Sequence, residues 1–125
     1  MRRAHGRKCA PCDALTKPIP LKEAKALAAE LHGGWRLIGG RALRLDLVMK
    51  DFMAAVRFID ALARAAEAEG HHPDLHLTGY RRLAVELTTH AIGGLSMNDF
   101  ILAEKIGALR RRQARPPRRG LVAAV

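Results

Sequence analysis

The sequence predicts an α+β fold in which a four-stranded sheet carries helices on one face. Segments whose apolar residues recur every three or four positions alternate with paired segments in which apolar and polar residues alternate. Their order is helix, two strands, helix, two strands, helix. Adjacent hairpins joined by a helix favour one antiparallel or mixed sheet with an apolar face and a polar face. A chain of 125 residues, 49% of them hydrophobic, is sufficient for one compact domain.

The first helix is expected at residues 20–32, and a hairpin is expected after it. Pro20 suits the start of the helix and Gly33 its end. Its apolar positions have helical spacing, at Leu21, Ala24, Leu27, Ala28 and Leu31. The hairpin consists of a short strand at 35–38, a turn at Gly39 and Gly40, and a longer strand at 41–50.

The second helix is expected between Asp51 and Gly70. Asp51 can cap its N-terminus, and Gly70 can adopt the left-handed conformation that ends a helix. Its predicted buried stripe consists of Phe52, Val56, Ile59 and Ala63, flanked by Ala55, Leu62 and Ala66. Glu67 lies in its last turn, and two adjacent histidines follow Gly70 directly.

Two more strands and a last helix complete the pattern. Residues 75–78 form a short strand and residues 80–90 a long one. In the long strand, the odd positions Leu83, Val85 and Leu87 face the core, whereas His90 lies on the polar side. The last helix begins near Ser96, and its apolar stripe consists of Phe100, Ala103, Ile106 and Leu109.

The net charge of +10 belongs to the two ends of the chain. Four positive charges lie within residues 2–8 and six within 110–119, and between them basic and acidic residues are equal in number. We therefore divide the chain into a flexible basic leader at 1–19, a domain at 20–109 and a basic disordered tail at 110–125. Basic tails can attract phosphates, but no aromatic residues lie among these arginines to stack on bases, so we do not expect nucleic acid as a partner.

The N-terminus carries the only two cysteines, and the chain carries no targeting pattern. Cys9 and Cys12 form a C-x-x-C pair, which can be half a zinc site or a redox motif. No second pair exists to complete a zinc site, so we expect a structural or incidental pair. No apolar run reaches the length of a membrane span, and no signal-peptide pattern follows the basic start. A cytoplasmic protein without a membrane partner is expected.

Histidines cluster in the segment EAEGHHPDLHLTGY at residues 67–80, and another follows at His90. His71 and His72 are adjacent, so in an extended segment they point to opposite sides, which suits chelation of one ion poorly. His72 and His76 are four apart, but a proline and an expected strand lie between them instead of a helix. Histidine exchanges protons near neutral pH. Spacing alone leaves acid/base catalysis, metal binding and no catalytic duty open.

Seven residues at these spacings resemble the signature of the pterin-4a-carbinolamine dehydratase family. They are Glu67, His71, His72, Pro73, Tyr80, His90 and Asp99. The segment THAIGGLSMNDFILAEKI also resembles the family's stretch from its third histidine into the last helix. The resemblance covers about residues 20–109. It implies four antiparallel strands with helices on one face, and dehydration of 4a-hydroxytetrahydropterin to quinonoid dihydropterin in pterin recycling, without metal or organic cofactor.

The same resemblance implies a set of site residues. His71, His72 and His90 are the expected catalytic residues, supported by Glu67, Asp99, Thr89 and the Gly34-Trp35 pair. We expect His71 and His90 to transfer protons and His72 to hold the pterin ring. Trp35 either packs near the pterin or fills a hydrophobic gap, and Asp99 either orients a histidine or stabilises the last helix. The chain departs from some relatives at Gly70, where they have an aspartate, and at Leu75 and His76, where aromatic residues are common.

Two other functions stay open at this point. The first is a non-catalytic binding, assembly or dimerisation factor on the same scaffold, with the basic tails docking a protein or nucleic acid. The intact histidine signature favours the enzyme over this alternative. The second is a metal-dependent hydrolase that uses the histidines. The resemblance also implies a homo-oligomer, dimer or tetramer, and an aromatic amino acid hydroxylase as a metabolic partner.

Overall fold

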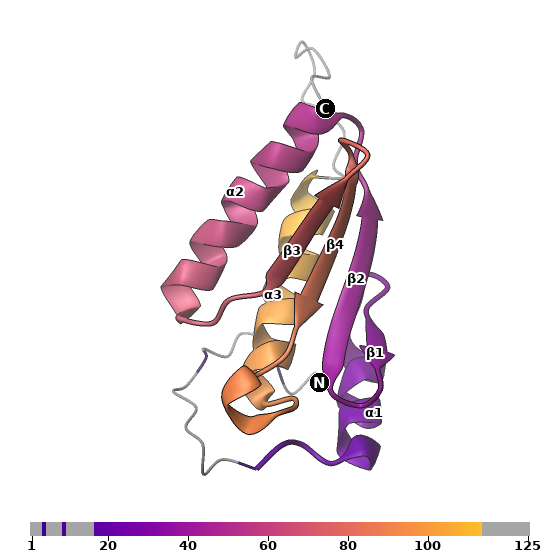
Figure 1. The fold of residues 1–125 in the computed structure, drawn as a ribbon, viewed down its shortest axis with the longest axis vertical. Helices are drawn as coiled ribbons and strands as arrows, with labels where there is room; N and C mark the ends of the chain where they lie inside the picture. The colour runs from indigo at the N-terminus through magenta and orange to yellow at the C-terminus, as the bar shows by residue number, and fades with distance from the viewer. Residues whose placement is uncertain (1–3, 5–8, 10–16, 114–125) are drawn as a thin grey trace.

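The computed structural model describes Ala4, Cys9 and residues 17–113 (Figure 1). Its elements are α1 (Leu21–Glu30), β1 (Arg36–Ile38), β2 (Ala42–Val48), α2 (Phe52–Glu69), β3 (Asp74–Thr78), β4 (Arg82–Leu87), the short 3-10 helix η1 (His90–Ile92) and α3 (Met97–Gln113). The predicted α+β class and the predicted order of helices and strands are confirmed. Cys12 and most of the predicted basic tail lie outside the described residues. Within the described part of the chain, no helix is both long and apolar enough to cross a membrane.

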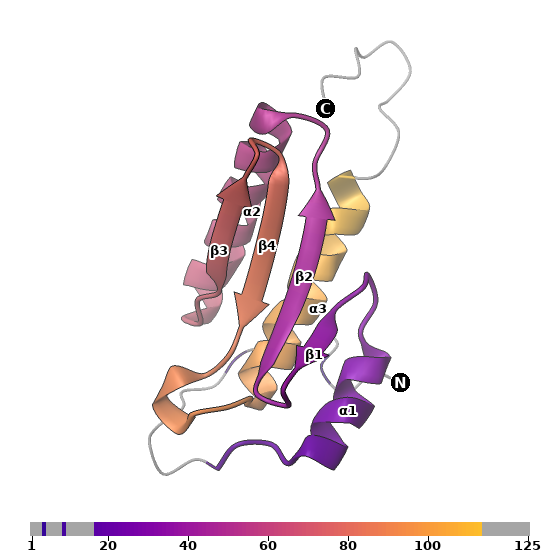
Figure 2. The ribbon, with the colours of Figure 1, turned by 45° about the vertical axis from the view of Figure 1, so that its right-hand side comes forward.

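The four strands form one antiparallel sheet in the order β1-β2-β4-β3. In the central pair, Leu45 lies opposite Val85 and Leu47 opposite Leu83, so apolar side chains of both strands share a face. Arg44 lies opposite Glu86 on the other face. Figure 2 shows α2 and α3 behind the sheet and α1 beside β1. The sheet is therefore apolar toward the helices and polar on its uncovered side, as its alternating pattern predicts.

The core lies between the sheet and the helices. Leu43, Leu45 and Leu47 of β2 are buried, and so are the core positions predicted for β4 and most of those predicted for the last helix. The largest fully buried side chains include Phe58 of α2 and Phe100 and Ile106 of α3. This packing fixes α2 and α3 side by side against the sheet, which places the end of one helix near the start of the other.

The predicted buried stripe of α2 is wrong. Phe52 is 50% exposed and Val56 38% exposed, whereas Phe58 and Leu62 are buried. The buried positions of the helix are Ala54, Ala55, Phe58, Leu62 and Ala66. The helix is apolar over more than one side, so two stripes fit helical spacing equally well, and only contact with the sheet and α3 decides between them.

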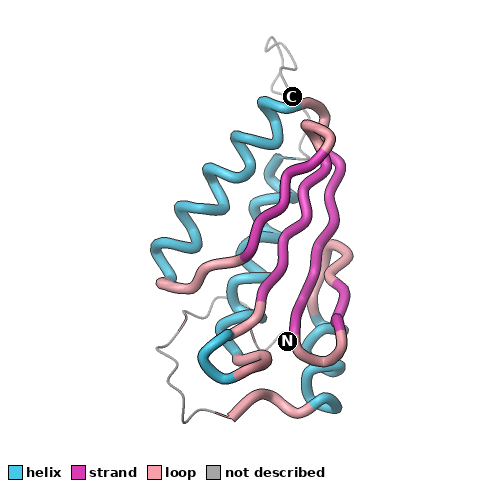
Figure 3. The backbone as a smooth tube through the Cα atoms, viewed as in Figure 1, coloured by secondary structure: helices cyan, strands magenta, loops and turns pink. Residues whose placement is uncertain are grey.

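The ends of the helices follow local chemistry. Asp51 caps α2 as predicted, because its Oδ1 accepts a hydrogen bond from the backbone N–H of Ala54 at 2.8 Å. Gly70 has φ 65° and ψ 25°, the left-handed conformation predicted for it. Ser96 precedes α3 as expected, although its hydroxyl contacts Thr89 instead of capping the helix. The loop after α2 and the short helix after β4 lie at the same end of the sheet (Figure 3), where the candidate site lies.

Candidate active site

His71 is placed by the way α2 ends. The backbone N–H of Gly70 donates to the carbonyl of Glu67, and that of His71 donates to the carbonyl of Ala66, both at 3.2 Å. These bonds close the last turn of the helix, and the left-handed Gly70 redirects the chain. The His71 side chain is consequently only 13% exposed and reaches Asp99 in the first turn of α3.

Asp99 is a fully buried carboxylate with three hydrogen-bond partners. His71 Nε2 lies 2.6 Å from its Oδ1. Its Oδ2 accepts from the Thr89 hydroxyl at 2.8 Å and from the backbone N–H of Ser96 at 2.9 Å. A buried charge is tolerated when its oxygens are hydrogen-bonded in this way. The carboxylate thus joins the end of α2, the end of β4 and the start of α3.

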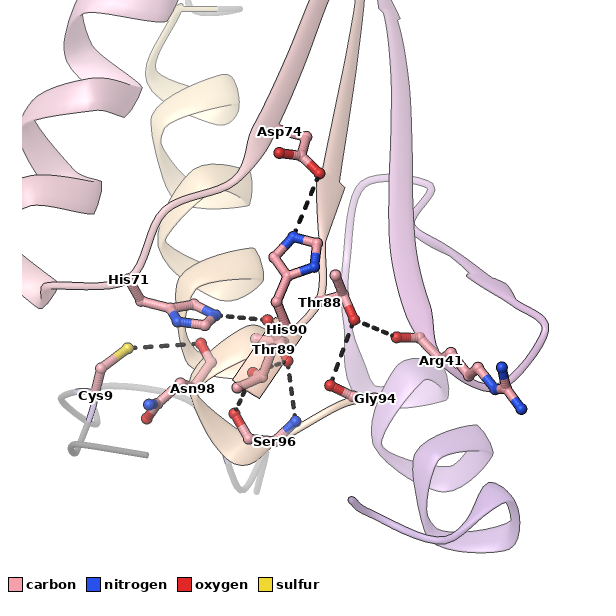
Figure 4. Close-up of polar contacts among 11 residues, drawn as sticks. Cys9, Arg41, His71, Asp74, Thr88, Thr89, His90, Gly94, Ser96 and Asn98 are labelled. Carbon is pink, nitrogen blue, oxygen red and sulfur yellow. Dashed lines mark hydrogen bonds and ion pairs between the residues drawn. The ribbon is translucent and has the colours of Figure 1, made fainter. Parts of the chain in front are cut away.

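His90 comes from the turn that follows β4. Thr89 pairs with Gly94 across this turn, and its backbone N–H donates to the Gly94 carbonyl at 2.9 Å. The Thr88 hydroxyl donates to the Arg41 carbonyl at 2.7 Å and so ties the turn to β2 (Figure 4). His90 itself is 79% exposed, and its Nε2 lies 3.8 Å from Asp74 Oδ2.

His72 forms a second histidine–carboxylate pair, in contact with water. Its Nε2 lies 2.7 Å from Glu67 Oε1. The two side chains are 61% and 78% exposed. The adjacent histidines therefore contact carboxylates of different elements, His71 that of α3 and His72 that of α2.

The three histidines line one pocket of about 560 Å³. Its walls are the end of α2, the end of β4 with the turn after it, and α3. The lining residues are Cys9, Glu69, Gly70, His71, His72, Thr88, Thr89, His90, Ala91 and Asn98. Several imidazoles around one cavity can give a proton to one atom of a bound molecule and take a proton from another.

Comparison with known protein families shows the family of the chain. Residues 17–109 match the profile of the family described as pterin 4 alpha carbinolamine dehydratase. The chain belongs to this family. A relative from Nitrosomonas eutropha, whose name gives this activity as a provisional assignment, is 43% identical over 103 residues, covering 82% of this chain and 89% of its own. The Arabidopsis thaliana protein named pterin-4-alpha-carbinolamine dehydratase 2, mitochondrial, is 40% identical over 106 residues, covering 82% of this chain and 57% of its own.

A solved structure supports the same assignment. The crystal structure described as a transcriptional coactivator/pterin dehydratase from Brucella melitensis has a TM-score of 0.68 to this chain. The two share 31% sequence identity, and the match covers 74% of this chain and 98% of the other. The membership in the pterin carbinolamine dehydratase family that the histidine signature predicted is confirmed.

Several residues of the pocket lining were not predicted from the sequence, among them Cys9 and Glu69. The backbone N–H of Cys9 donates to Glu69 Oε1 at 2.7 Å, and its thiol donates to the Asn98 carbonyl at 3.5 Å. Burial, together with the nearby Glu69 carboxylate, raises the pKa of the Cys9 thiol to about 12. Glu69 also lies 3.5 Å from Lys105 Nζ. No sequence pattern signals this contact, because Cys9 and Glu69 are 60 positions apart.

Trp35, Glu67 and Asp99 belong to the predicted site but not to the lining of the pocket, and Asp99 reaches it only through His71. Trp35 is 8% exposed and packs in the hydrophobic core, and within the described residues its indole N–H has no hydrogen-bond partner. Glu67 contacts the pocket only through His72, because its own side chain is not part of the lining. His76 lies on β3 and is also absent from the lining.

The described residues of this dehydratase-family protein hold no group of three or more His, Cys, Asp and Glu side chains that could ligate one metal ion. The nearest approach to such a cluster is the pair of separate histidine–carboxylate contacts. His71 contacts Asp99 and His72 contacts Glu67, so each imidazole uses its Nε2 on a different carboxylate.

Proposed function

We propose that this protein dehydrates 4a-hydroxytetrahydropterin to quinonoid dihydropterin by histidine acid/base catalysis. The observation that carries the proposal is the convergence of His71, His72 and His90 on one pocket in a member of the pterin carbinolamine dehydratase family. The pocket volume of about 560 Å³ falls in the range of small-molecule sites. The expected substrate is therefore a pterin carbinolamine.

The reaction needs one proton donor and one proton acceptor. The C4a–O bond breaks, the leaving hydroxyl takes a proton from a general acid and departs as water, and N5 loses its proton to a general base. Each form of assistance typically contributes about 10²–10⁴-fold to the rate. A proton moves from acid to substrate and another from substrate to base, so one proton exchange with solvent restores the enzyme. No electrons are transferred, and the chemistry requires neither metal nor organic cofactor.

The three histidines differ in ways that suit these roles. His71 is only 13% exposed and is held by a buried carboxylate, whereas His90 lines the same pocket and is 79% exposed. We assign the two proton transfers to His71 and His90. His72, which is held by the exposed Glu67, orients the pterin ring.

Assay of carbinolamine breakdown by the full chain tests this proposal. His71→Ala and His90→Ala should each lower kcat by about 10²–10⁴-fold, and His72→Ala should chiefly raise KM. His76→Ala is the matched control, because this exposed histidine lies outside the pocket, and it should retain normal turnover. Near-normal activity of His71→Ala or His90→Ala would remove the proposed roles.

Metal analysis of the same preparation distinguishes acid/base dehydration from a metal-dependent hydrolase. Turnover should persist after dialysis against a chelator, and zinc should be far below one ion per chain. Stoichiometric zinc together with activity lost to the chelator would overturn the acid/base mechanism.

A binding role on the same scaffold is the second candidate, favoured by the description of the Brucella melitensis relative as a transcriptional coactivator as well as a pterin dehydratase. The basic ends of the chain are the expected docking segments. Replacing the basic residues within 2–8 and 115–119 by glutamine should leave turnover intact if the protein is only an enzyme. Loss of a co-purifying protein or nucleic acid in that variant would instead establish the binding role.

A further inference from the structure

A chain of hydrogen bonds runs from Ser96 to the ring of His71. Ser96 Oγ lies 2.8 Å from Thr89 Oγ1, Thr89 Oγ1 lies 2.8 Å from Asp99 Oδ2, and Asp99 Oδ1 lies 2.6 Å from His71 Nε2. Ser96 is 5% exposed, Thr89 6% and Asp99 0%. Figure 4 shows Ser96 and Thr89 beneath His71, with the dashed contacts between them. Buried polar groups are normally hydrogen-bonded. The side chains of Ser96, Thr89 and Asp99 are all buried, and they hydrogen-bond to one another.

The available protons determine which group donates in each of these hydrogen bonds. An ionised carboxylate only accepts hydrogen bonds, and both partners of Asp99 Oδ2 are donors, the Thr89 hydroxyl and the backbone N–H of Ser96. The Thr89 hydroxyl has one proton and donates it to Asp99. Ser96 must then donate its own hydroxyl proton to Thr89. At the other end, the His71 ring donates from Nε2 to Asp99 Oδ1. In the neutral imidazole this leaves Nδ1 unprotonated and able to accept a proton.

Ser96 acts on the carboxylate twice. Its hydroxyl holds the Thr89 oxygen, and its backbone N–H donates directly to Asp99 Oδ2 at 2.9 Å. The turn that brings Thr89 and Ser96 together is closed by the pairing of Thr89 with Gly94. It is anchored further by the backbone N–H of Ile19, which donates to the Leu95 carbonyl at 2.8 Å. The Ser96 hydroxyl is therefore a fixed donor at the start of the chain.

We propose that Ser96 is a positioning residue of this site, which acts through Thr89 and Asp99 to hold His71 as the Nε2–H tautomer with Nδ1 free to accept the substrate proton. This inference rests on the proposed dehydratase function and deepens it, because it names His71 as the base. Ser96 does not touch the substrate, since it is absent from the pocket lining. Without the Ser96 hydroxyl, Thr89 is free to rotate, Asp99 Oδ2 loses a fixed donor, and the carboxylate is held less firmly against the Nε2–H of His71.

Nitrogen-15 NMR of the histidine rings in the full chain tests the tautomer directly and does not depend on activity. In the neutral form of its ring, wild-type His71 should show a protonated Nε2 and an unprotonated Nδ1. Ser96→Ala should show a mixture of tautomers, and its kcat should fall about tenfold with KM within about twofold of wild type. Thr89→Val should behave like Ser96→Ala, whereas Thr89→Ser, which keeps the hydroxyl, should restore both signals. Thr78→Val is the control, because Thr78 is an exposed residue of β3 outside this network, and it should match wild type.

The outcomes separate this inference from the proposed function. Wild-type protein that shows the Nε2–H tautomer but no carbinolamine turnover would refute the function and leave the hydrogen-bond chain standing. Turnover with an unprotonated Nε2 in wild type would refute the inference alone, even if Ser96→Ala failed to fold. A wild-type kcat and a wild-type His71 tautomer in Ser96→Ala would also refute it. So would equal losses of kcat in Thr89→Ser and Thr89→Val.

Discussion

His71 and His72 are neighbours in sequence, and each contacts a carboxylate at nearly the same distance, 2.6 Å to Asp99 and 2.7 Å to Glu67. Their surroundings differ. Asp99 is fully buried and Glu67 is 78% exposed. Water and salt screen an exposed pair, and both partners lose side-chain entropy when they form it, so such pairs stabilise a protein little. The buried pair has no solvent to replace either partner, and its geometry is fixed.

This contrast predicts unequal effects for two conservative substitutions. Asp99→Asn should lower kcat by about 100-fold or more, because an amide cannot accept from Thr89, Ser96 and His71 in the same way as a carboxylate. Glu67→Gln should change kcat and KM only a few-fold. Steady-state kinetics of both variants, with circular dichroism to establish that each is folded, measures the difference. Equal losses in the two variants would contradict the distinction between buried and exposed pairs.

At the scale of single elements, the left-handed end of α2 directs His71 to α3. Gly70 has φ 65°, and a Cβ at this position would meet no atom within 4 Å. Gly39, in the turn between β1 and β2, has φ 58° and is equally open. Alanine at either position is therefore strained by its backbone conformation alone and meets no steric clash. The two glycines form a matched pair that differs in distance from the pocket.

Gly70→Ala and Gly39→Ala should each lower the free energy of unfolding by about 1–2 kcal/mol, the cost of the left-handed conformation for a residue with a Cβ. Gly70→Ala should also lower kcat, because relief of the strain shifts the backbone that carries His71. Gly39→Ala should keep wild-type kcat. Urea unfolding and turnover assays of both variants provide the measurements, and an equal kcat in the two would show that the end of α2 does not position His71.

The elements also show where sequence reasoning reaches its limit. Alternation in β2 and β4 determined which side faces the core, because a strand has only two sides. Helical spacing in α2 did not determine which side is buried, because the helix has apolar residues on more than one side. Contact with the sheet decides which of them are buried. The histidine signature predicted the family and the three histidines of the pocket, but not that Asp99 accepts from Thr89 and Ser96. Those bonds depend on the turn after β4, whose closure by Thr89 and Gly94 no local pattern encodes.

At the scale of the whole molecule, Glu69 joins three distant parts of the chain. It lies at the end of α2, accepts from the backbone N–H of Cys9, and pairs with Lys105 of α3. The hydrogen bond from Cys9, with help from Lys105, lowers the pKa of the Glu69 carboxyl below its usual 4.5. A carboxylate with a lowered pKa in the folded state stabilises the fold above its unfolded pKa, and this stabilisation is lost as the pH falls through the folded pKa.

Glu69→Gln should therefore lower the midpoint of thermal unfolding at pH 7 by about 3–5 °C. The difference from wild type should shrink as the pH falls below 4.5, the value of the unfolded carboxyl, since the wild-type carboxylate then becomes protonated. Asp60→Asn is the control, because it removes only an exposed pair with Arg64 on α2. Thermal melts from pH 7 to pH 3 measure both variants. A constant difference across this range would show that the charge of Glu69 contributes nothing.

The contact with Glu69 should make the Cys9 thiol slow to react. Its pKa of about 12 lies three units above the ordinary 9.0, mainly through burial and the Glu69 carboxylate. Only the thiolate attacks alkylating reagents, so at pH 8 the thiol in a Cys12→Ser background should react roughly a thousandfold more slowly than in urea. Glu69→Gln should accelerate labelling, since the carboxylate that disfavours the thiolate is gone and the anchor of Cys9 is weakened.

A pterin analogue in the pocket should slow labelling of Cys9 further, because Cys9 lines the wall of the pocket. Iodoacetamide labelling followed by mass spectrometry measures these rates, and labelling of the folded protein as fast as in urea would contradict the packing of Cys9 against Glu69.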